Sequence, residues 1–179
     1  MSVEDIMVEF IPINVNLHKS DLIKLTEEYF TWINEEVQQR YSIDTFSIIG
    51  ESILEYAKKT LEQLSSYLPP EGIYYILQVK GKIGGMGALR KLKLDVGEIK
   101  RMYIKPEYRK KGYGKAMLIQ LLKKGKEFGF STIRLDTGKF MDAAQYVYRS
   151  AGFQERDKYP ETEVPPQFQP FWLYMEKSL

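Results

Sequence analysis

The sequence predicts an α/β protein with a mixed, mostly antiparallel central sheet of about seven strands flanked by about four helices. Seven short segments rich in β-branched and aromatic residues are bounded by turn residues, and four longer segments carry apolar residues at helical spacing. The 179 residues contain no repeat, no low-complexity tract and no evident domain boundary. We therefore expect a single domain over residues 1–179.

The composition is that of an ordinary globular protein, with 44% hydrophobic and 28% charged residues. No apolar run approaches the roughly 18 residues of a membrane span, and the opening MSVEDIMVEF lacks the basic region of a signal peptide. We expect a cytoplasmic protein without a membrane partner. The absence of cysteine excludes disulfides, thiolate metal sites and a cysteine nucleophile, and the single histidine, His18, argues against a His-rich metal site or a Ser-His-Asp triad.

The first part of the chain predicts one strand and two helices. Alternation over 8–15 indicates a strand, and Pro12 places it at a sheet edge. A helix follows with Ser20 as its N-cap, because the apolar residues after it recur at helical spacing. A second helix covers about 51–67 and ends before Pro69.

The rest of the chain predicts a meander of three strands and then alternating helices and strands. Residues 72–92 form two strands joined by a tight turn at Lys80, Gly81 and Lys82, and residues 97–104 form the third. The later elements are a helix over about 112–128, a strand over 131–137, a short helix over 141–152 closed by Gly152, and strands over 152–158 and 170–179.

Positive charge is concentrated between the third meander strand and the next helix. Arg109, Lys110 and Lys111 precede Gly112 directly, in a chain whose net charge is only +2. A helix that begins here presents free backbone N–H groups and the positive end of its dipole, and Gly112 and Gly114 leave room for an anion. The pattern indicates a phosphate or pyrophosphate site. The alternative is a solvated basic helix face.

Two familiar phosphate loops do not fit this stretch. A Walker A loop requires Ser or Thr after its lysine, and Lys115 is followed by Ala116. A dinucleotide-binding fingerprint requires a third glycine where Met117 stands.

Two motifs resemble those of one enzyme family. EIKRMYIKPEYRKKGYGKAML resembles the acyl-CoA-binding signature of the GNAT N-acetyltransferases, R/Q-x-x-G-x-G/A, with Arg109, Gly112 and Gly114 in its three places. AAQYVYRSAGF resembles the later family motif A-x-x-x-Y-x-x-x-G-F, with Ala144, Tyr148, Gly152 and Phe153 in position. The resemblance covers roughly 73–153 and implies the GNAT fold, with acetyl-CoA as cosubstrate and an amine as acceptor.

The resemblance also implies where the cofactor lies. The backbone of Lys110 to Lys115 would hold the pyrophosphate with Arg109 fixing the loop, and the strand Met102 to Ile104 would splay from its neighbour and pair with the pantetheine arm. The cofactor-binding residues expected on this basis are Met102, Tyr103, Ile104, Arg109, Lys110, Lys111, Gly112, Tyr113, Gly114 and Lys115.

Two catalytic residues are expected. Tyr148 is the general acid, since a phenol with a pKa near 10 protonates a departing thiolate of pKa about 8.5. Glu98 stands where some family members place a general base, although an ordinary Glu with a pKa of about 4.3 is poorly matched to an amine. The alternatives are a core tyrosine and a structural glutamate at a strand start. Without cysteine, direct transfer is favoured over an acyl-enzyme.

One position departs from the family pattern. Met141 stands where many members carry a cofactor-contacting Asn, which weakens the expectation of a contact there. In the family the acceptor pocket is shaped by the first two helices and by the loop before the last strand. That implication points to Tyr29, Trp32, Glu35, Glu36, Tyr159, Glu161 and Glu163, whose aromatic and acidic side chains suit a cationic amine.

Two other readings stay open. One is a catalytically inactive module of the same fold that binds acyl-CoA as a sensor. The other is a nucleic-acid binder using the basic helix, against which the near-neutral overall charge argues. A homodimer is compatible with the sequence.

Overall fold

The computed structural model describes residues 7–179, except for the side chains of Ser65 and Ser66. The signal-peptide expectation therefore falls partly outside the described residues. These residues cluster into two compact units, Ile13–Ser66 and a second unit made of 7–12 with Tyr67–Leu179. Each unit is described by itself, and the single domain stays a prediction.

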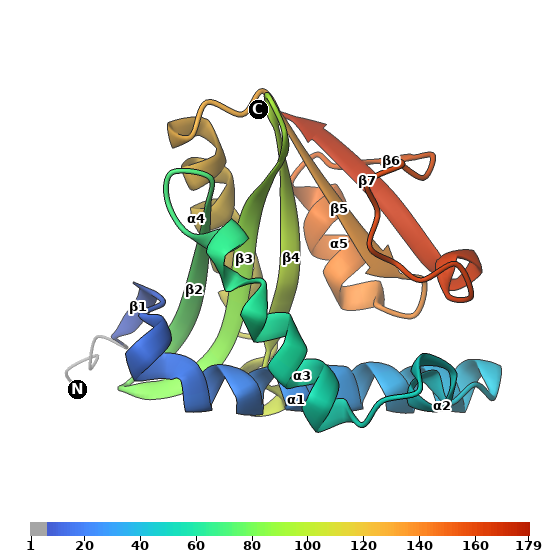
Figure 1. The fold of residues 1–179 in the computed structure, drawn as a ribbon. Coiled ribbons are helices and arrows are strands. Elements are labelled where there is room, and N and C mark those ends of the chain that lie inside the picture. Colours follow the sequence, from blue (N-terminus) through green and yellow to red (C-terminus); the bar gives the residue numbers. More distant parts are fainter. Residues whose placement is uncertain (1–6) are drawn as a thin grey trace. The chain divides into compact units, whose positions relative to one another are not determined.

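The first unit is helical. It contains α1 (Val15–Tyr41), α2 (Thr45–Ile49) and α3 (Ile53–Glu62), and α1 packs against α3 (Figure 1). A short 3₁₀ turn (Leu64–Tyr67) follows α3 where the second predicted helix was expected to continue. Ser52 and Glu55 form a capping box at the start of α3, with each side chain bonding the other residue's backbone N–H.

Two predictions about the helical unit are wrong. The N-cap of α1 is Asn14 and not Ser20, because the Asn14 side chain accepts hydrogen bonds from the N–H groups of Asn16 and Leu17. The preceding strand consequently ends at Pro12. Helix α2 was not predicted, because one turn held by the Asp44 cap is too short to show apolar periodicity.

The second unit is built on a seven-stranded sheet in the order β1-β2-β3-β4-β5-β7-β6. The strands are β1 (Val8–Pro12), β2 (Gly72–Val79), β3 (Lys82–Lys93), β4 (Val96–Ile104), β5 (Thr132–Gly138), β6 (Gln154–Arg156) and β7 (Trp172–Ser178). Among the described strand pairs, β4 and β5 are parallel and the others antiparallel. The predicted mixed, mostly antiparallel sheet is confirmed.

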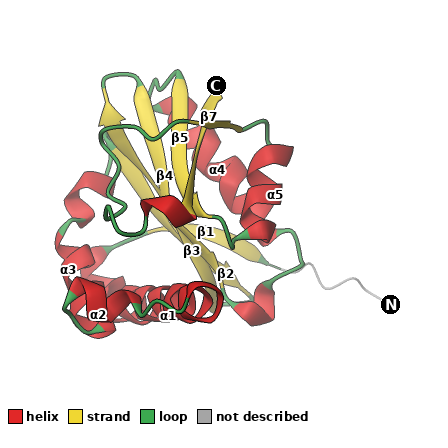
Figure 2. Ribbon diagram, turned by 90° about the vertical axis from the view of Figure 1, so that its right-hand side faces the viewer, coloured by secondary structure: helices red, strands yellow, loops and turns green. Residues whose placement is uncertain are grey.

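One face of the sheet carries the apolar core. Helices α4 (Tyr113–Glu127) and α5 (Asp142–Ser150) lie on the same side of it (Figure 2). Their buried residues pack against the alternate strand residues that point to that side; the cluster includes Met117, Leu118, Leu121, Tyr148, Ile99, Ile133, Leu135 and Met175. Each fully buried large apolar side chain contributes about 1.5–3 kcal/mol.

The parallel pair β4 and β5 stays together over only part of its length. Pairing runs from Val96 with Thr132 to Ile99 with Leu135 and then stops, although the strands continue to Ile104 and Gly138. Figure 1 shows the two strands diverging beyond this point. The splayed strand expected at Met102 to Ile104 is thus present.

A β-bulge in β4 lies at the start of this divergence. Met86 pairs with Tyr103 and Ala88 with Lys100, so three steps on β4 oppose two on β3. Arg101 adopts a left-handed φ of 54° there. The extra residue shifts the alternation, so that Met102 faces the same core as Ile99.

Gly85 permits β3 to approach the end of β4. A Cβ at this position would overlap the carbonyl oxygen of Tyr103 and lie 2.9 Å from Cδ1 of Ile104.

We expect Gly85→Ala to lower the free energy of unfolding by about 1–3 kcal/mol, because a backbone atom cannot move aside as a flexible side chain does. Chemical denaturation checks this. Gly114→Ala is the control, since its Cβ meets nothing closer than 3.9 Å; equal stability of both variants would contradict the argument.

Candidate active site

The loop between β4 and α4 has the conformation of an anion-binding turn. After a short 3₁₀ turn (Pro106–Tyr108), Lys110 and Gly112 adopt left-handed φ values of 60° and 82°. Gly112 is the N-cap of α4, and no side chain bonds the first turn of the helix there. The first N–H groups of the helix therefore face outward together with the positive end of its dipole.

The two motif glycines have different reasons to be glycine. Gly112 needs the left-handed conformation that L side chains rarely adopt. At Gly114, by contrast, a Cβ would face open space, with Cγ1 of Ile104 the nearest atom at 3.9 Å. Folding does not demand a glycine at position 114, so its absent side chain points to something that approaches the backbone.

Arg109 ties this loop to the end of β4. Its Nε donates a hydrogen bond of 2.9 Å to the carbonyl oxygen of Ile104, and its guanidinium lies 5.6 Å from the centre of the Tyr103 ring. Lys111 is folded back onto the loop, donating to the carbonyl of Glu107 at 2.9 Å. The exposed Lys110 and Lys115 side chains flank the turn. The structure thus gathers the basic residues of the motif around the N-terminus of α4.

Tyr148 meets β4 at the divergence. Its side chain is 5% exposed, its ring packs edge-on against Phe153, and its hydroxyl lies 3.9 Å from Sδ of Met102. Met102 lies beyond the last β4–β5 pair, where no described strand pairs with β4 on that side. The second sequence motif and the splayed strand are therefore adjacent in space.

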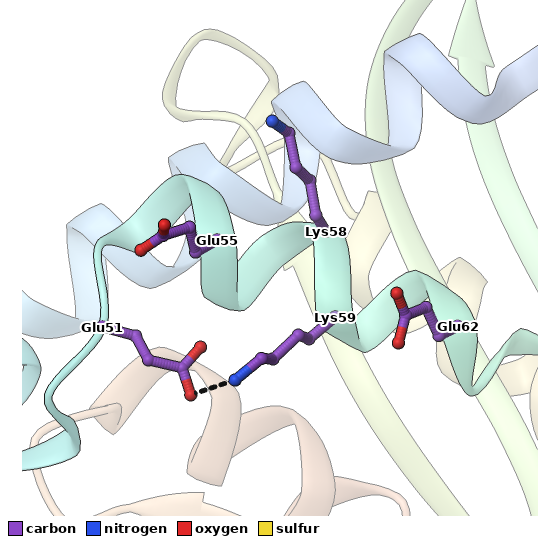
Figure 3. A pocket seen from close by; sticks show the side chains of 5 residues that line it. All are labelled: Glu51, Glu55, Lys58, Lys59 and Glu62. Atoms are coloured by element: carbon purple, nitrogen blue, oxygen red, sulfur yellow. Dashed lines mark hydrogen bonds and ion pairs between the residues drawn. The ribbon is translucent and has the colours of Figure 1, made fainter.

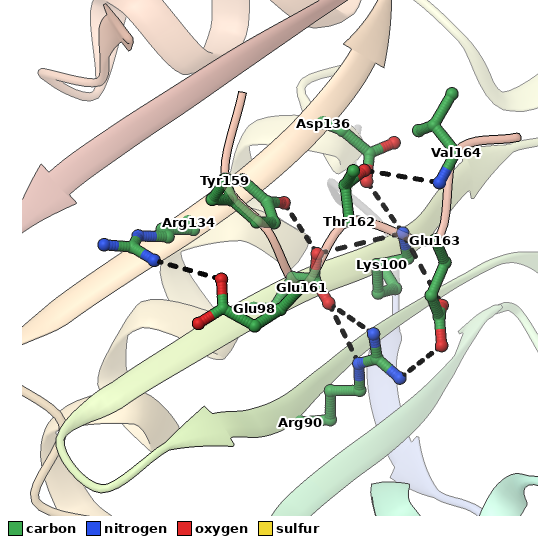
Figure 4. A network of polar contacts seen from close by, with 10 residues as sticks. All are labelled: Arg90, Glu98, Lys100, Arg134, Asp136, Tyr159, Glu161, Thr162, Glu163 and Val164. Carbon is green, nitrogen blue, oxygen red and sulfur yellow. Dashed lines mark hydrogen bonds and ion pairs between the residues drawn. The ribbon is translucent and has the colours of Figure 1, made fainter. Parts of the chain in front are cut away.

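Glu98 faces the opposite side of the sheet from Tyr148. It is fully buried: its Oε2 accepts hydrogen bonds of 2.9 and 2.7 Å from Nε and Nη2 of Arg90, and its Oε1 accepts one of 2.6 Å from the hydroxyl of Tyr159 (Figure 4). As a base it would have to be reached by the amine or by a bridging water, and none of its surface is exposed. Its role as general base stays a prediction, and these contacts weigh against it.

Lys100 is the first β4 residue beyond the stretch that pairs with β5. Its Nζ is 2.7 Å from Oδ2 of Asp136 and 3.9 Å from carboxylate oxygens of both Glu98 and Glu163. Burial alone would lower the pKa of Lys100, but the charges of Asp136 and Glu98 outweigh it and raise the pKa well above the ordinary value. The lysine is therefore held as a cation.

The acidic residues expected to meet a cationic amine are already paired with cations. Glu163 lies 2.6 Å from Nη1 of Arg90, and Glu161 lies 3.7 Å from Lys93 and 3.8 Å from Arg134. Tyr159 is fully buried.

The other expected acceptor residues lie on α1, in the helical unit. The rings of Tyr29 and Trp32 stack with centroids 6.4 Å apart, and Glu36 pairs with Arg40 at 3.1 Å. Glu35 lies on the same helix.

Sequence reasoning missed the cations on the face of the sheet that carries Glu98 and Lys100, which we call the polar face. The strand register places Arg90, Glu98, Arg134 and Glu176 in one row across β3, β4, β5 and β7, with alternating charge. Charged residues at alternate positions of two predicted strands, Glu98 with Lys100 and Arg134 with Asp136, were the signal, but only the register shows that they line up.

Met141 packs inward before α5. It is 9% exposed, and its Sδ lies 3.5 Å from the hydroxyl of Thr137. A thioether cannot make the hydrogen bonds of an Asn amide, so Met141 departs from the family pattern as expected.

A hollow of about 310 Å³ lies along α3 in the helical unit (Figure 3). It is lined by Glu51, Glu55, Lys58, Lys59 and Glu62. Lys59 is bonded to Glu51, and the Glu55 carboxylate accepts from the backbone N–H of Ser52 in the capping box. None of the predicted site residues lies in it.

Within residues 7–179, no cluster of three or more His, Asp or Glu side chains could hold a metal ion. In the same range, no helix combines the length and the apolar character that crossing a membrane requires.

Comparisons with known proteins agree with this geometry. Residues 24–153 match the model of the acetyltransferase (GNAT) family. The uncharacterized N-acetyltransferase YjgM of Escherichia coli is 29% identical over 94 residues, which are 51% of this chain and 56% of that protein. The uncharacterized N-acetyltransferase YsnE of Bacillus subtilis is 25% identical over 74% of this chain and 95% of its own.

A solved structure shares the fold. The PaiA N-acetyltransferase of Thermoplasma acidophilum, crystallised in complex with coenzyme A, superimposes with a TM-score of 0.71 over 97% of this chain and 99% of its own, at 20% identity. Because the family model covers well over half of the sequence and the sheet has the same fold as this enzyme, the chain belongs to the GNAT family of acetyltransferases.

Proposed function

We propose that the protein is an N-acetyltransferase that transfers the acetyl group of acetyl-CoA directly to a primary amine of a small molecule or of a peptide. The observation that carries this proposal is the divergence of β4 and β5, which has the hydroxyl of Tyr148 beside it and the uncapped turn at Gly112 beyond its end. A thioester arm and its diphosphate need such an arrangement of backbone groups.

The pyrophosphate would bind at the start of α4. The helix dipole contributes about 0.3–1 kcal/mol per charge, and direct hydrogen bonds from backbone N–H groups to a charged acceptor add roughly 1.5–3 kcal/mol each. Lys110 and Lys115, both exposed, supply counter-charge at the rim. Arg109 keeps the loop in place through its bond to Ile104.

The pantetheine arm would lie along the free side of β4. Its two amide groups are able to bond the backbone of Met102 to Ile104 as an added strand would. A backbone N–H there, that of Met102, would polarise the thioester carbonyl. The bulge at Arg101 orients this stretch toward the side on which Tyr148 lies.

Tyr148 would act as the general acid. The amine nitrogen attacks the carbonyl carbon, the C–S bond breaks, and the thiolate takes the proton of the Tyr148 hydroxyl; the proton lost by the amine returns to the phenolate through solvent. A phenol has an ordinary pKa of about 10, so it is protonated near neutral pH and holds a proton to donate as the C–S bond breaks.

Calorimetric titration with acetyl-CoA, followed by an assay for free CoA thiol over a panel of amines, tests the proposal. Saturable one-to-one binding with amine-dependent thiol release supports the transferase. Binding without release for any amine would instead support the acyl-CoA sensor module. No binding would overturn both.

Gly114→Val places a branched side chain over the first turn of α4, where the unsubstituted backbone faces open space. We expect the Kd for CoA to rise about a hundredfold, as the loss of a hydrogen bond to a charged group predicts. Calorimetry measures this, and thermal unfolding should show an intact fold. Ile119→Val, on the exposed side of the same helix, is the control. Equal affinity in both variants would remove the turn from the binding site.

Tyr148→Phe deletes only the hydroxyl of a side chain that remains packed against Phe153. We expect kcat to fall by roughly 10²–10⁴-fold, the usual contribution of a general acid, with the Kd for acetyl-CoA unchanged. Tyr146→Phe, on the same helix but 74% exposed, should behave as wild type. Steady-state kinetics with an accepted amine checks both, and an undiminished kcat would exclude Tyr148 from the chemistry.

A further inference from the structure

The segment between β6 and β7 is fastened to the polar face of the sheet. We call residues 159–164 the strap. Three sheet cations each pair with carboxylates of both the sheet and the strap: Arg90 with Glu98 and Glu163, Lys100 with Asp136, Glu98 and Glu163, and Arg134 with Glu176 and Glu161. Figure 4 shows the strap lying across these residues.

Tyr159 is the most deeply placed part of the strap. Its hydroxyl donates to Oε1 of Glu98. The centre of its ring is 5.4 Å from the guanidinium carbon of Arg134 and 5.6 Å from that of Arg156, and the ring packs edge-on against Tyr174. Burial first, and then the negative charge of Glu98, raise the pKa of Tyr159 far above its ordinary value. The hydroxyl therefore remains a donor to Glu98 throughout the working pH range.

The strap reaches the divergence of β4 and β5. Glu163 is 3.9 Å from the Nζ of Lys100, the first β4 residue beyond the paired stretch. In the proposed reaction Tyr148 protonates the leaving thiolate from the side of the sheet on which α5 lies. The amine must then approach the carbonyl from another side, and the strap borders the opposite face of the sheet.

We infer that Glu98 is a positioning residue: its buried carboxylate anchors the strap through Tyr159 and Arg90, and the anchored strap forms a wall of the site for the acceptor amine. The acceptor site in this inference rests on the proposed transferase function, whereas the anchoring of the strap is a property of the fold. A base role would require the amine, or a water bonded to it, to reach a carboxylate that is fully buried and already bonded by Arg90 and Tyr159. An anchoring role requires only the contacts that it has.

Tyr159→Phe tests the anchor most cleanly, because it removes one hydroxyl and leaves every charge in place. We expect amide hydrogen exchange within 157–164 to become about 10- to 100-fold faster, as loss of a hydrogen bond to a charged group predicts. The KM for the acceptor should rise about tenfold or more, with kcat and its pH profile unchanged. Tyr146→Phe is the matched control.

Glu98→Gln distinguishes anchor from base. As an anchor, this variant should repeat the pattern of Tyr159→Phe: faster exchange in the strap, a raised acceptor KM, and an unaltered pH profile of kcat. A fall in kcat of roughly 10²–10⁴-fold with loss of the low-pH limb of its profile, and a strap as protected as in the wild type, would overturn the inference in favour of a base.

The exchange measurement also separates this inference from the proposed function. If the wild type bound no acetyl-CoA, the proposed function would fail, while strap exchange in Tyr159→Phe would still decide whether Glu98 is an anchor. If acetyl-CoA bound and strap exchange did not change in either variant, the anchor alone would fail.

Discussion

The structure depends on how β4 changes partners along its length. Up to Ile99 the strand is paired on both sides, and beyond it β5 leaves while β3 stays. An unpaired strand edge inside a sheet leaves backbone donors and acceptors that something must satisfy. The bulge at Arg101 then turns Met102 toward Tyr148, whereas regular alternation would place it on the opposite face. One break in pairing and one extra residue thus leave β4 with an unpaired edge and place Met102 beside the hydroxyl of Tyr148.

The two faces of β4 are packed in different ways. On the α4 and α5 side, apolar packing fixes Tyr148 and the start of α4. On the other side, buried charge takes the place of an apolar core. Burying ions costs several kcal/mol each, and the cost is offset only when every charge is paired in good geometry. Here the cations Arg90, Lys100 and Arg134 each meet at least two carboxylates, and one of these in each case belongs to the strap.

Local signals in the sequence predicted most of the fold. Period-two segments, the helix after Gly112 and the motif at Tyr148 all appear where expected, because each depends on residues close together in the chain. The start of α1 was misplaced at Ser20 because several residues able to cap a helix lie between Asn14 and Asp21, and periodicity alone did not choose Asn14. The contacts of Glu98 could not be predicted, since they join Arg90 and Tyr159 across strand register and a long loop. Local pattern carries no information on such pairings.

The most direct test of the account is amide hydrogen exchange of the wild-type protein with and without acetyl-CoA. We expect acetyl-CoA to add protection at Lys110 to Lys115, where the diphosphate would accept hydrogen bonds. We also expect added protection at Met102 to Ile104, where the pantetheine arm would pair with the strand edge that β5 leaves free. Protection confined to other segments, with saturable binding established under the same conditions, would contradict it.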